Sequence, residues 1–555
     1  MLNPLFNKNG GQRQLSYDKY NLMFGRLITL LILAVLLLQC EDREKESLSI
    51  ALPNRDSLNI NIGSDPPTLD WSLATDSTSY TIILNIMDGL TRFGKDYKPE
   101  PSLAESWDIS EDGKTIVFHL RKNVSWSDGR PLKAKDFEYS WKRLLNPKTG
   151  ADYAYFLYDI EGAEEYNTGK EDDPEKVGVK AIDDSTLLVK LRRPASYFLS
   201  LLTFMSTFPM REDVVKKHGL KWTEPKNIVT VGPFRLSNWR HHEKILLTKN
   251  PNYWGEKPKL TEVEMIMNEN PTSALALYEG GELDYIDGRS IPTLEVPRLR
   301  LSREFNTEPQ FRGNYIGFNA KKPPFDNPLV RRAFSAAIDR AKIAELIQGA
   351  GVPTTSWIPQ GMLGYDSEIG IEFNPEQARA WLAEAGYPDG NGFPEVLFLY
   401  PDVGNNRIVS EALQSMWRRY LGVDVELQNQ EWKVYLSTLD TDPPQVFRAN
   451  WGADFPDPHN FMNLFECNSG NNETRWCNKL YDELVEKAAV EENPEKRVAL
   501  YKEAQKILTE ADVPIAPILR SIQQSMIKPY VVGLNLNPLG MVFFNQVSFA
   551  DKISN

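Results

Sequence analysis

The sequence is poor in the side chains and motifs that most catalytic and metal sites require. Its 555 residues include three cysteines and five histidines, and it contains neither a G-x-S-x-G nucleophile motif nor the complete G-x-x-x-x-G-K-S/T motif of a phosphate loop. The stretch H-H-E-K-I-L at 241–246 begins like the zinc motif H-E-x-x-H, but Leu246 stands where the second histidine is needed. We therefore expect no metal, no cofactor and no enzymatic activity, and we place His241 and His242 on the solvated side of a strand. A glycosidase built on paired carboxylates is the enzymatic alternative that composition leaves open.

Runs of basic residues are also missing. The formal net charge is −13 at pH 7, and nucleic acids and anionic membranes are bound by clustered Lys and Arg. We therefore exclude a nucleic-acid partner. With 41% hydrophobic and 25% charged residues the composition is that of a globular protein, and the length predicts two or three domains.

The sequence lacks an apolar run long enough to cross a membrane, which requires about 20 residues. The longest run has 12 residues (27–38), and basic residues precede it (Lys8, Arg13, Lys19 and Arg26). A short apolar run after a basic segment is typical of a signal peptide. It ends at Gln39-Cys40, with Leu37 three places before the cysteine, which looks like a lipoprotein box in which Gln39 replaces the usual small residue. We predict a lipoprotein signal peptide (1–39), a lipid on Cys40 and a tether (40–47); an ordinary signal peptide with a chance cysteine is the alternative.

These features predict an exported protein in the cell envelope or periplasmic space, anchored by lipid to a bacterial membrane. The exported part holds Cys467 and Cys477, which enclose N-S-G-N-N-E-T-R-W. In an oxidising compartment two such cysteines favour a disulfide. Two free thiols are the alternative.

The first half of the chain predicts short strands and helices. Alternation over 58–63 indicates a strand, 79–90 a helix, and 105–121 a hairpin around Asp112-Gly113. The spacing of Phe137, Trp141 and Leu144 predicts a helix over 134–145 that ends before Pro147. The segment 181–191 is typical of another hairpin.

The second half alternates strands and helices. We expect a strand at 395–400, an amphipathic helix at 407–421 and a strand at 422–430, which together make a βαβ unit with a parallel pair. A third strand is expected at 445–451. Ligands in such sheets bind beyond the carboxyl ends of the strands, and Asp454 lies at that position, in A-N-W-G-A-D-F-P-D-P.

Several longer motifs resemble those of one family. They are G-S-D-P-P-T-L-D (63–70), S-W-S-D-G-R-P-L-K-A-K-D-F (125–137), K-K-P-P-F-D-N-P-L-V-R-R-A-F (321–334), N-Q-E-W (429–432) and W-G-A-D-F (451–455). In this order they resemble the oligopeptide-binding proteins of ABC importers, a class of extracytoplasmic solute receptors that also includes dipeptide, murein-peptide and nickel receptors. The resemblance runs from about residue 58 to about residue 545.

The resemblance implies an α/β fold of the two-lobed periplasmic-binding-protein type, in the large three-domain variety. Carried onto this chain, lobe one covers 48–88, 213–312 and 523–555, and an extra α+β domain is inserted at 89–212. Lobe two covers 313–522. The implied function is capture of short peptides between two closing lobes and their delivery to an ABC permease and its ATPase subunits, with the receptor acting as a monomer.

The resemblance also implies the ligand contacts. Asp454 matches the aspartate that receives the peptide α-ammonium, although capping of the turn before Pro456 is an alternative for its side chain. The main chain of Asn450 and Gly452 matches the strand end that pairs with the peptide backbone. Trp451 and Trp432 match tryptophans of the side-chain pockets, with ordinary core packing as their alternative.

Two further positions each have an alternative role. Tyr153 matches a tyrosine that helps to hold the ligand's N-terminal end, or it packs against Tyr155 or Phe156. Arg448 matches an arginine that meets the ligand's carboxylate, directly or through water, or serves structural ion pairs.

The chain departs from the family where an arginine and a histidine can hold the carboxylate, because Leu439 and Asn406 stand there. Thr75 stands where the family has a glutamate, with Asp76 beside it. A murein peptide, a dipeptide or another specialised solute is the alternative ligand, and a surface lipoprotein that binds host proteins is a further one.

Overall fold

The computed structural model describes residues 56–94, 97–402, 404–467 and 469–550. The expected signal peptide, Cys40 and the tether lie outside these residues. Within the described residues no helix is both long enough and apolar enough to span a membrane.

A mixed sheet of eleven strands forms the centre of the described structure. Its strand order is β15-β14-β16-β12-β17-β11-β1-β10-β9-β8, and β13 pairs with β17 at the side. The strands are β1 (Ser57–Asn61), β8 (Phe234–Arg240), β9 (Lys244–Lys249), β10 (Glu262–Ile266), β11 (Tyr285–Asp287), β12 (Phe305–Phe318), β13 (Gly351–Pro353), β14 (Leu397–Pro401), β15 (Glu426–Gln430), β16 (Val446–Gly452) and β17 (Ile515–Ile527).

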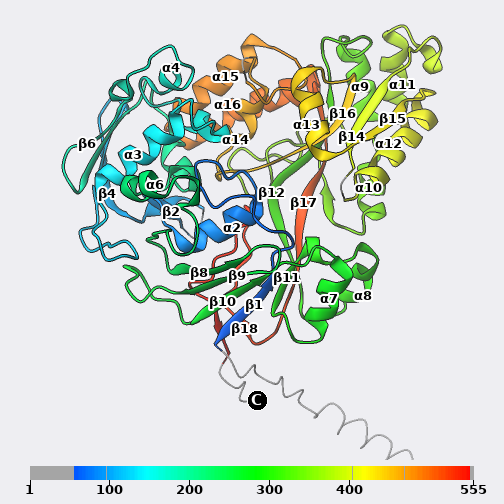
Figure 1. Ribbon diagram of the computed structural model, residues 1–555. Coiled ribbons are helices and arrows are strands. Elements are labelled where there is room, and N and C mark those ends of the chain that lie inside the picture. The colour runs from blue at the N-terminus through cyan, green and yellow to red at the C-terminus, as the bar shows by residue number, and fades with distance from the viewer. Residues whose placement is uncertain (1–55, 95–96, 403, 468, 551–555) are drawn as a thin grey trace, which may run out of the picture. The chain divides into compact units, whose positions relative to one another are not determined.

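The two longest strands, β12 and β17, connect the two ends of this sheet. They pair antiparallel with each other, and register shifts interrupt the pairing between Pro309 and Gly313 and between Asn314 and Tyr315. Figure 1 shows them running from the group β1, β8–β11 to the group β14–β16. The expected domain boundaries at 312/313 and 522/523 lie inside these strands.

The remaining strands form small sheets. Between residues 104 and 190 four strands pair in the order β4-β5-β7-β6, and two-stranded sheets pair β2 with β3 and β18 with β19. Their bounds are β2 (Thr91–Phe93), β3 (Pro99–Pro101), β4 (Ala104–Ile109), β5 (Thr115–Leu120), β6 (Val179–Ala181), β7 (Thr186–Lys190), β18 (Val531–Val532) and β19 (Ser548–Phe549). The hairpin β4–β5 turns at Gly113, whose φ of 67° suits glycine.

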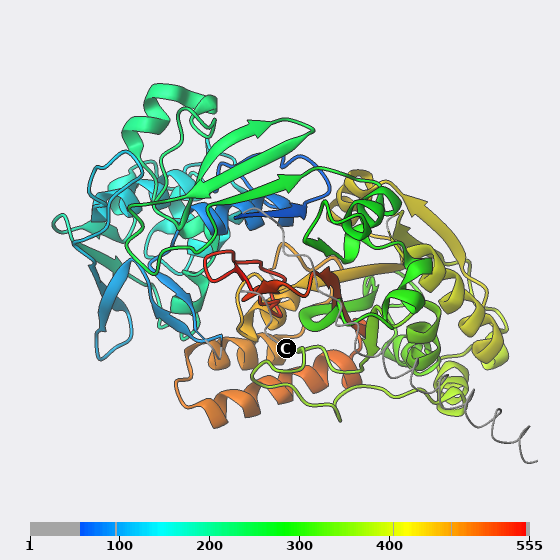
Figure 2. The same ribbon diagram turned by 90° about the horizontal axis from the view of Figure 1, so that it is seen from below.

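Helices pack on these sheets, and α15 and α16 run side by side (Figure 1 and Figure 2). The helices are α2 (Ser77–Ile86), α3 (Ala134–Leu145), α4 (Ala163–Asn167), α5 (Phe198–Leu201), α6 (Glu212–His218), α7 (Pro271–Glu279), α8 (Val296–Leu299), α9 (Pro328–Ala336), α10 (Arg340–Leu346), α11 (Pro375–Glu384), α12 (Asn406–Leu421), α13 (Trp432–Thr441), α14 (His459–Met462), α15 (Lys479–Val490) and α16 (Pro494–Lys506). A 3₁₀ helix, η1, covers Asp152–Leu157.

Most expected elements are confirmed. The β14–α12–β15 unit has the expected parallel pair, from Leu397 opposite Glu426 to Pro401 opposite Gln430. Helix α12 ends at Gly422, which has the left-handed φ of 71° typical of a helix end. One expectation is wrong in detail. His241 and His242 are exposed, as expected, but they lie in a turn and not in a strand, because β8 ends at Arg240 and β9 begins at Lys244.

Candidate ligand site

A cavity of about 510 Å³ opens at the carboxyl end of β16. This volume is in the range of small-molecule and cofactor sites. Its walls come from segments distant in sequence: the start of α2, η1, β12, β16, α13 and the loop 463–478. The lining includes Thr75, Asp76, Ser77, Tyr80, Tyr153, Phe204, Gln310, Arg312, Tyr315, Tyr435, Leu439, Asp440, Arg448–Asp454, Asn471 and Glu473.

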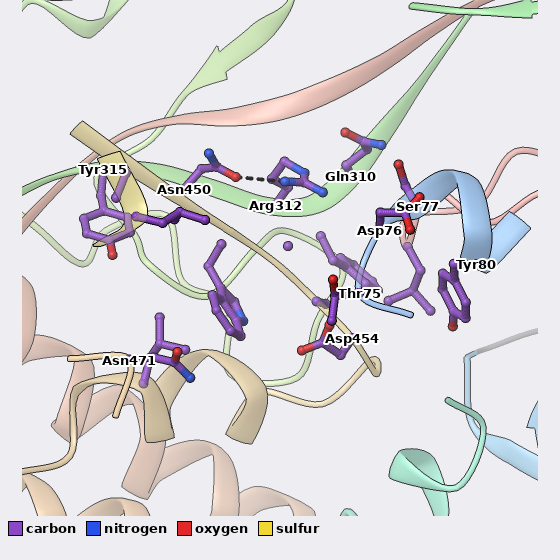
Figure 3. Close-up of a pocket in the computed structure, with 18 of the residues that line it drawn as sticks. Thr75, Asp76, Ser77, Tyr80, Gln310, Arg312, Tyr315, Asn450, Asp454 and Asn471 are labelled. Carbon is purple, nitrogen blue, oxygen red and sulfur yellow. Dashed lines mark hydrogen bonds between the residues drawn. The ribbon is translucent and has the colours of Figure 1, made fainter. Parts of the chain in front are cut away.

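Asp454 lies in this cavity two residues after the end of β16, as Figure 3 shows. Its Oδ1 accepts a hydrogen bond from the Tyr153 hydroxyl at 3.2 Å, and its Oδ2 accepts one from the Asn460 amide at 3.3 Å. Burial raises the pKa of Asp454 to about 6, although these two donors and the more distant Arg312 act in the opposite direction. The carboxylate is therefore held in place without an ion pair to any described residue, which leaves it suited to receive a cation.

The turn after Asp454 is capped by another residue. Asp457 Oδ1 accepts the His459 backbone N–H at 2.8 Å, and the Asp457 carboxylate pairs with Arg497 at 2.7 and 2.8 Å. Asp457 thus caps the turn that follows Pro456, and among the described residues no backbone N–H donates to the Asp454 carboxylate.

Asn460 positions the Asp454 side chain, and sequence analysis missed it. It is 3% exposed, and its Oδ1 accepts the Asp454 backbone N–H and the Trp451 indole N–H, both at 3.1 Å. One buried amide thus fixes Asp454 and Trp451 together. The only sequence signal is an asparagine six residues after the aspartate, which is too common to be informative.

Tyr153 packs among aromatic rings, as one of its two predicted roles requires, and it also contacts Asp454. Its hydroxyl reaches Asp454, and its ring packs edge-on against Phe156 and Phe204, each at a centroid distance of 4.8 Å. Burial is the largest cause of its raised pKa, so the hydroxyl stays protonated and donates.

The last residues of β16 have one unpaired edge. On one side β16 pairs with β12 from Val446 to Gly452, and on the other it pairs with β14 only at Val446 and Phe447. The Ala453 N–H donates to the Phe311 carbonyl of β12 at 2.8 Å. Because backbone groups alternate along a strand, the N–H and C=O groups of Gly452 point to the other, unpaired edge.

By the same alternation, the backbone N–H and C=O groups of Asn450 also point to the unpaired edge of β16. Farther back along this edge, the Arg448 carbonyl accepts the Tyr435 hydroxyl at 2.6 Å. No hydrogen bond from a described residue occupies the backbone groups that Asn450 and Gly452 present to this edge. An extended peptide can pair with such an edge.

Arg448 and Asn406 lie on a second cavity of about 610 Å³, which also reaches Asn450 and Asn314. Arg448 is 7% exposed, and its Nε has no hydrogen-bond partner among the described residues. Burial lowers its pKa to about 10. No carboxylate of the described residues pairs with Arg448, so the structural ion pair considered for it is not present there.

The other predicted positions are distributed around the main cavity. Trp451 and Leu439 line it. Trp432 begins α13, but its side chain lies outside the described part. Thr75 and Asp76 both line the cavity, and Asp76 also caps α2 by accepting the backbone N–H groups of Thr78 and Ser79 in its first turn.

Two charged residues of the cavity were also missed. Arg312 donates to Asn450 Oδ1 at 2.8 Å, and Glu473 has its pKa raised to about 7, with burial as the main cause. Neither belongs to a recognisable motif. Their positions follow from strand pairing and from the loop that carries Glu473, and these are properties of the folded chain.

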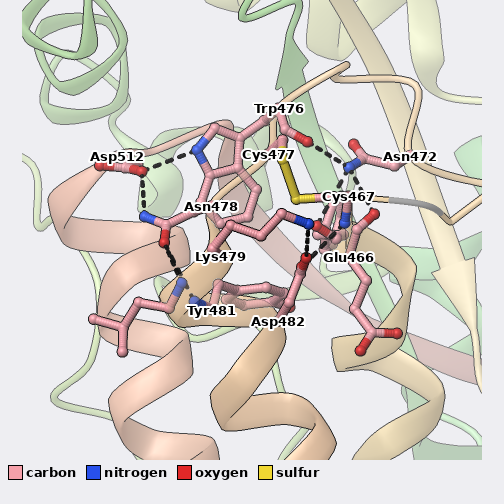
Figure 4. The surroundings of a disulfide bond; sticks show 12 residues. Glu466, Cys467, Asn472, Trp476, Cys477, Asn478, Lys479, Tyr481, Asp482 and Asp512 are labelled. Carbon is pink, nitrogen blue, oxygen red and sulfur yellow. Dashed lines mark hydrogen bonds and ion pairs between the residues drawn. A yellow bond between two sulfur atoms is a disulfide. The ribbon is translucent and has the colours of Figure 1, made fainter.

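That loop is closed by a disulfide between Cys467 and Cys477 (Figure 4). Asn472 stabilises it from inside, since its amide donates to the Trp476 carbonyl at 2.9 Å. The loop carries Asn471 and Glu473 to the cavity wall. Among the described residues no group of three or more His, Cys, Asp or Glu side chains could hold a metal ion.

Comparison with known proteins agrees with this geometry. Residues 98–473 match the family described as bacterial extracellular solute-binding proteins, family 5. The chain is 35% identical over 507 residues to the oligopeptide-binding protein OppA of Bacillus subtilis, with 89% of this chain and 92% of that one covered. The chain belongs to this family.

Other family 5 proteins are similar along the same length. The periplasmic oligopeptide-binding protein OppA of Escherichia coli is 33% identical, with 87% of this chain and 90% of that one covered. Among solved structures, the murein tripeptide-binding protein MppA of Escherichia coli has a TM-score of 0.78 at 30% identity, covering 90% of this chain and 99% of that one. Haemophilus influenzae OppA in complex with RPPGFSPFR has a TM-score of 0.76 at 31% identity, covering 90% and 100%. The two-lobed α/β fold expected from the sequence is thereby confirmed, and these relatives are binding proteins of transport systems.

Proposed function

We propose that this family 5 protein is an extracytoplasmic receptor that captures short peptides and delivers them to an ABC-type peptide permease powered by its ATPase subunits. The observation that carries this proposal is the position of Asp454 in the cavity, at the end of a strand with an unpaired edge. The peptide-binding relatives support it.

Asp454 receives the peptide ammonium in this proposal. A charge that enters a cavity loses its water and requires a charge-assisted partner. Asn450 and Gly452 pair with the peptide backbone, which gives affinity without selecting a sequence. Trp451 and Trp432 contribute to side-chain pockets, and Arg448 and Asn406 contact the carboxyl end of longer ligands.

Closure follows from the proposed division into lobes, with lobe one at 48–88, 213–312 and 523–555, the inserted domain at 89–212, and lobe two at 313–522. The continuous strands β12 and β17 support it, because two strands that pass from one lobe to the other can act as a hinge. Ligand stabilises the closed state through its greater affinity for that state.

We further propose that Cys40 carries a lipid that anchors the exported monomer to a bacterial membrane. The apolar run 27–38 before Cys40 supports this. Labelling of growing cells with a radioactive fatty acid tests it: the wild-type protein should be labelled and a Cys40→Ala variant should not. A labelled Cys40→Ala variant would contradict it.

Native mass spectrometry of the protein as purified tests the main proposal. A heterogeneous set of adducts with the masses of short peptides is expected, because backbone pairing accepts many sequences. A single discrete non-peptide mass would overturn it, as would an empty protein whose melting temperature no peptide mixture raises. A murein tripeptide is the second candidate, favoured by the similarity to MppA, and it would give one peptide mass.

A further inference from the structure

Three neighbouring cavities meet at the side chain of Arg312 on β12. Beside the main cavity lie one of about 420 Å³, toward β1 and β11, and one of about 610 Å³, toward α12. Among the described residues Arg312 alone lines all three. In Figure 3 it lies between Asn450 and Gln310.

The guanidinium of Arg312 is largely unused by the protein. Its Nη1 donates to Asn450 Oδ1 at 2.8 Å, and no carboxylate of the described residues forms an ion pair with it. Arginine has five N–H donors in a fork that matches a carboxylate. Donors therefore remain for a ligand.

Gly452 allows Arg312 to take this position. The two residues are paired across β12 and β16, and a Cβ on Gly452 would lie 2.7 Å from Arg312 Nη2. Without a side chain at 452, the guanidinium lies close over β16 and reaches Asn450, whose backbone faces the unpaired edge.

Charge makes this arrangement selective. A ligand ammonium at Asp454 adds a positive charge near Arg312, which already interacts electrostatically with that carboxylate. An ammonium alone places a second positive charge near the arginine and leaves the arginine without an anion. A ligand with a carboxylate at the right distance satisfies both groups.

The strand register sets that distance. Arg312 is opposite Gly452, two residues from Asp454, whereas Arg448 is opposite Ile316 and six residues from Asp454. Because β16 ends at Gly452, the rise of about 3.3 Å per residue gives upper limits of about 7 Å and 20 Å along the backbone from Asp454 to these positions. The termini of an extended dipeptide are about 7 Å apart.

We propose that Arg312 receives the carboxylate of the shortest peptide ligands, those of two or three residues. Short ligands are then recognised as zwitterions between Asp454 and Arg312, and longer ligands extend past Arg312 toward Arg448. This proposal rests on the proposed function, since it requires the ammonium at Asp454.

Calorimetry with four ligands tests it: dialanine, dialanine amide, tetraalanine and tetraalanine amide. The full chain is measured at pH 7.5, where Asp454 is ionised. The wild-type protein should bind dialanine at least tenfold more tightly than its amide. In Arg312→Gln, dialanine and its amide should bind equally well, and the acid-to-amide ratio of tetraalanine should be the same as in the wild-type protein. Arg312→Lys keeps the charge and loses the forked donors, so its acid-to-amide ratio for dialanine should lie between those of the wild-type protein and Arg312→Gln.

Arg419→Gln is the matched control, because it removes the same charge from an exposed position on α12 and should change neither ratio. An unchanged dialanine ratio in Arg312→Gln would overturn the proposal, and so would a wild-type protein that binds tetraalanine but not dialanine. Equal weakening of acids and amides would show that Arg312 acts only through Asp454, which also contradicts it. Failure of the proposed function looks different, since no peptide would then bind the wild-type protein.

Discussion

Asp454 illustrates a conflict between stability and binding at a single residue. Its carboxylate accepts hydrogen bonds from a phenol and an amide beside aromatic rings, and none of the described residues forms an ion pair with it. A partly buried carboxylate of this kind costs folding free energy, and in the proposed function a ligand ammonium offsets that cost on binding. Part of the peptide affinity thus comes from relief of an unfavourable charge.

The first prediction concerns stability. The pKa of Asp454 is about 6 in the folded protein and 3.8 is its ordinary value. Between these values the folded state binds more protons than the unfolded state, so stability falls as pH rises from 4 to 6. Asp454→Asn should therefore raise the free energy of unfolding of the empty protein by about 1–3 kcal/mol at pH 7.5 and by little at pH 4. Urea denaturation at both pH values measures it, and equal effects at the two pH values would contradict it.

The second prediction concerns affinity and pH. Peptide amines remain charged below pH 7, so Asp454 controls binding in acid. Its protonation below pH 6 competes with the ligand, and peptide affinity should fall about tenfold per unit of pH below that value. Calorimetry from pH 4.5 to 8 checks this. In Asp454→Asn the decrease in affinity below pH 6 should disappear, whereas Glu473, whose pKa is about 7, still titrates in the same cavity above that range. A slope that persists below pH 6 would assign the effect to another group.

The end of β16 shows how one element makes a general binding surface. Its first residues are paired on both sides, whereas Asn450 and Gly452 have one open edge inside the cavity. A peptide that adds a strand there uses main-chain hydrogen bonds, so its side chains are left to the surrounding pockets.

The third prediction follows from the way backbone hydrogen-bonding groups alternate along the open edge of β16. In a series of tetraalanines, each with one N-methylated amide, methylation should weaken binding strongly at an amide that faces β16 and weakly at the next one. Each lost hydrogen bond is worth about 0.5–1.5 kcal/mol, and the added methyl group clashes with the strand. Calorimetry gives the pattern. Equal losses at consecutive positions would mean that the ligand is not paired as a strand.

Elements with local signals were predictable from the sequence, and the site was predictable only in part. The β14–α12–β15 unit followed from hydrophobic periodicity, and α3 from the spacing of Phe137, Trp141 and Leu144. Asp454 followed from a motif next to a strand end. Asn460 and Arg312 did not, because their roles depend on a buried hydrogen bond and on strand register, which no local pattern encodes.

At the scale of the whole molecule, contacts beside Asp454 connect the segment 150–200 with the segment 450–490. Phe455 is 2% exposed, packs edge-on against Phe156 and stacks on Tyr197, each at a centroid distance of 5.9 Å. Nearby, the Ser196 hydroxyl donates to the Ala489 carbonyl at 2.8 Å. In the proposed division these contacts join the inserted domain to lobe two, and we expect them to stabilise the proposed closed state.

The fourth prediction is that Phe455→Ala weakens peptide binding by tenfold or more, although Phe455 does not line the cavity. Removing the ring deletes the contact between the two parts, and the ligand must then supply more of the free energy of closure. Phe373→Ala, which removes a half-exposed ring that packs on Tyr420, is the matched control and should leave affinity unchanged.

Calorimetry across pH separates an effect on closure from damage to the Asp454 site. If closure alone is affected, affinity falls equally at every pH and keeps its decrease below pH 6, whereas displacement of Asp454 would abolish that decrease. An affinity equal to that of the wild-type protein would show that these contacts do not contribute to closure.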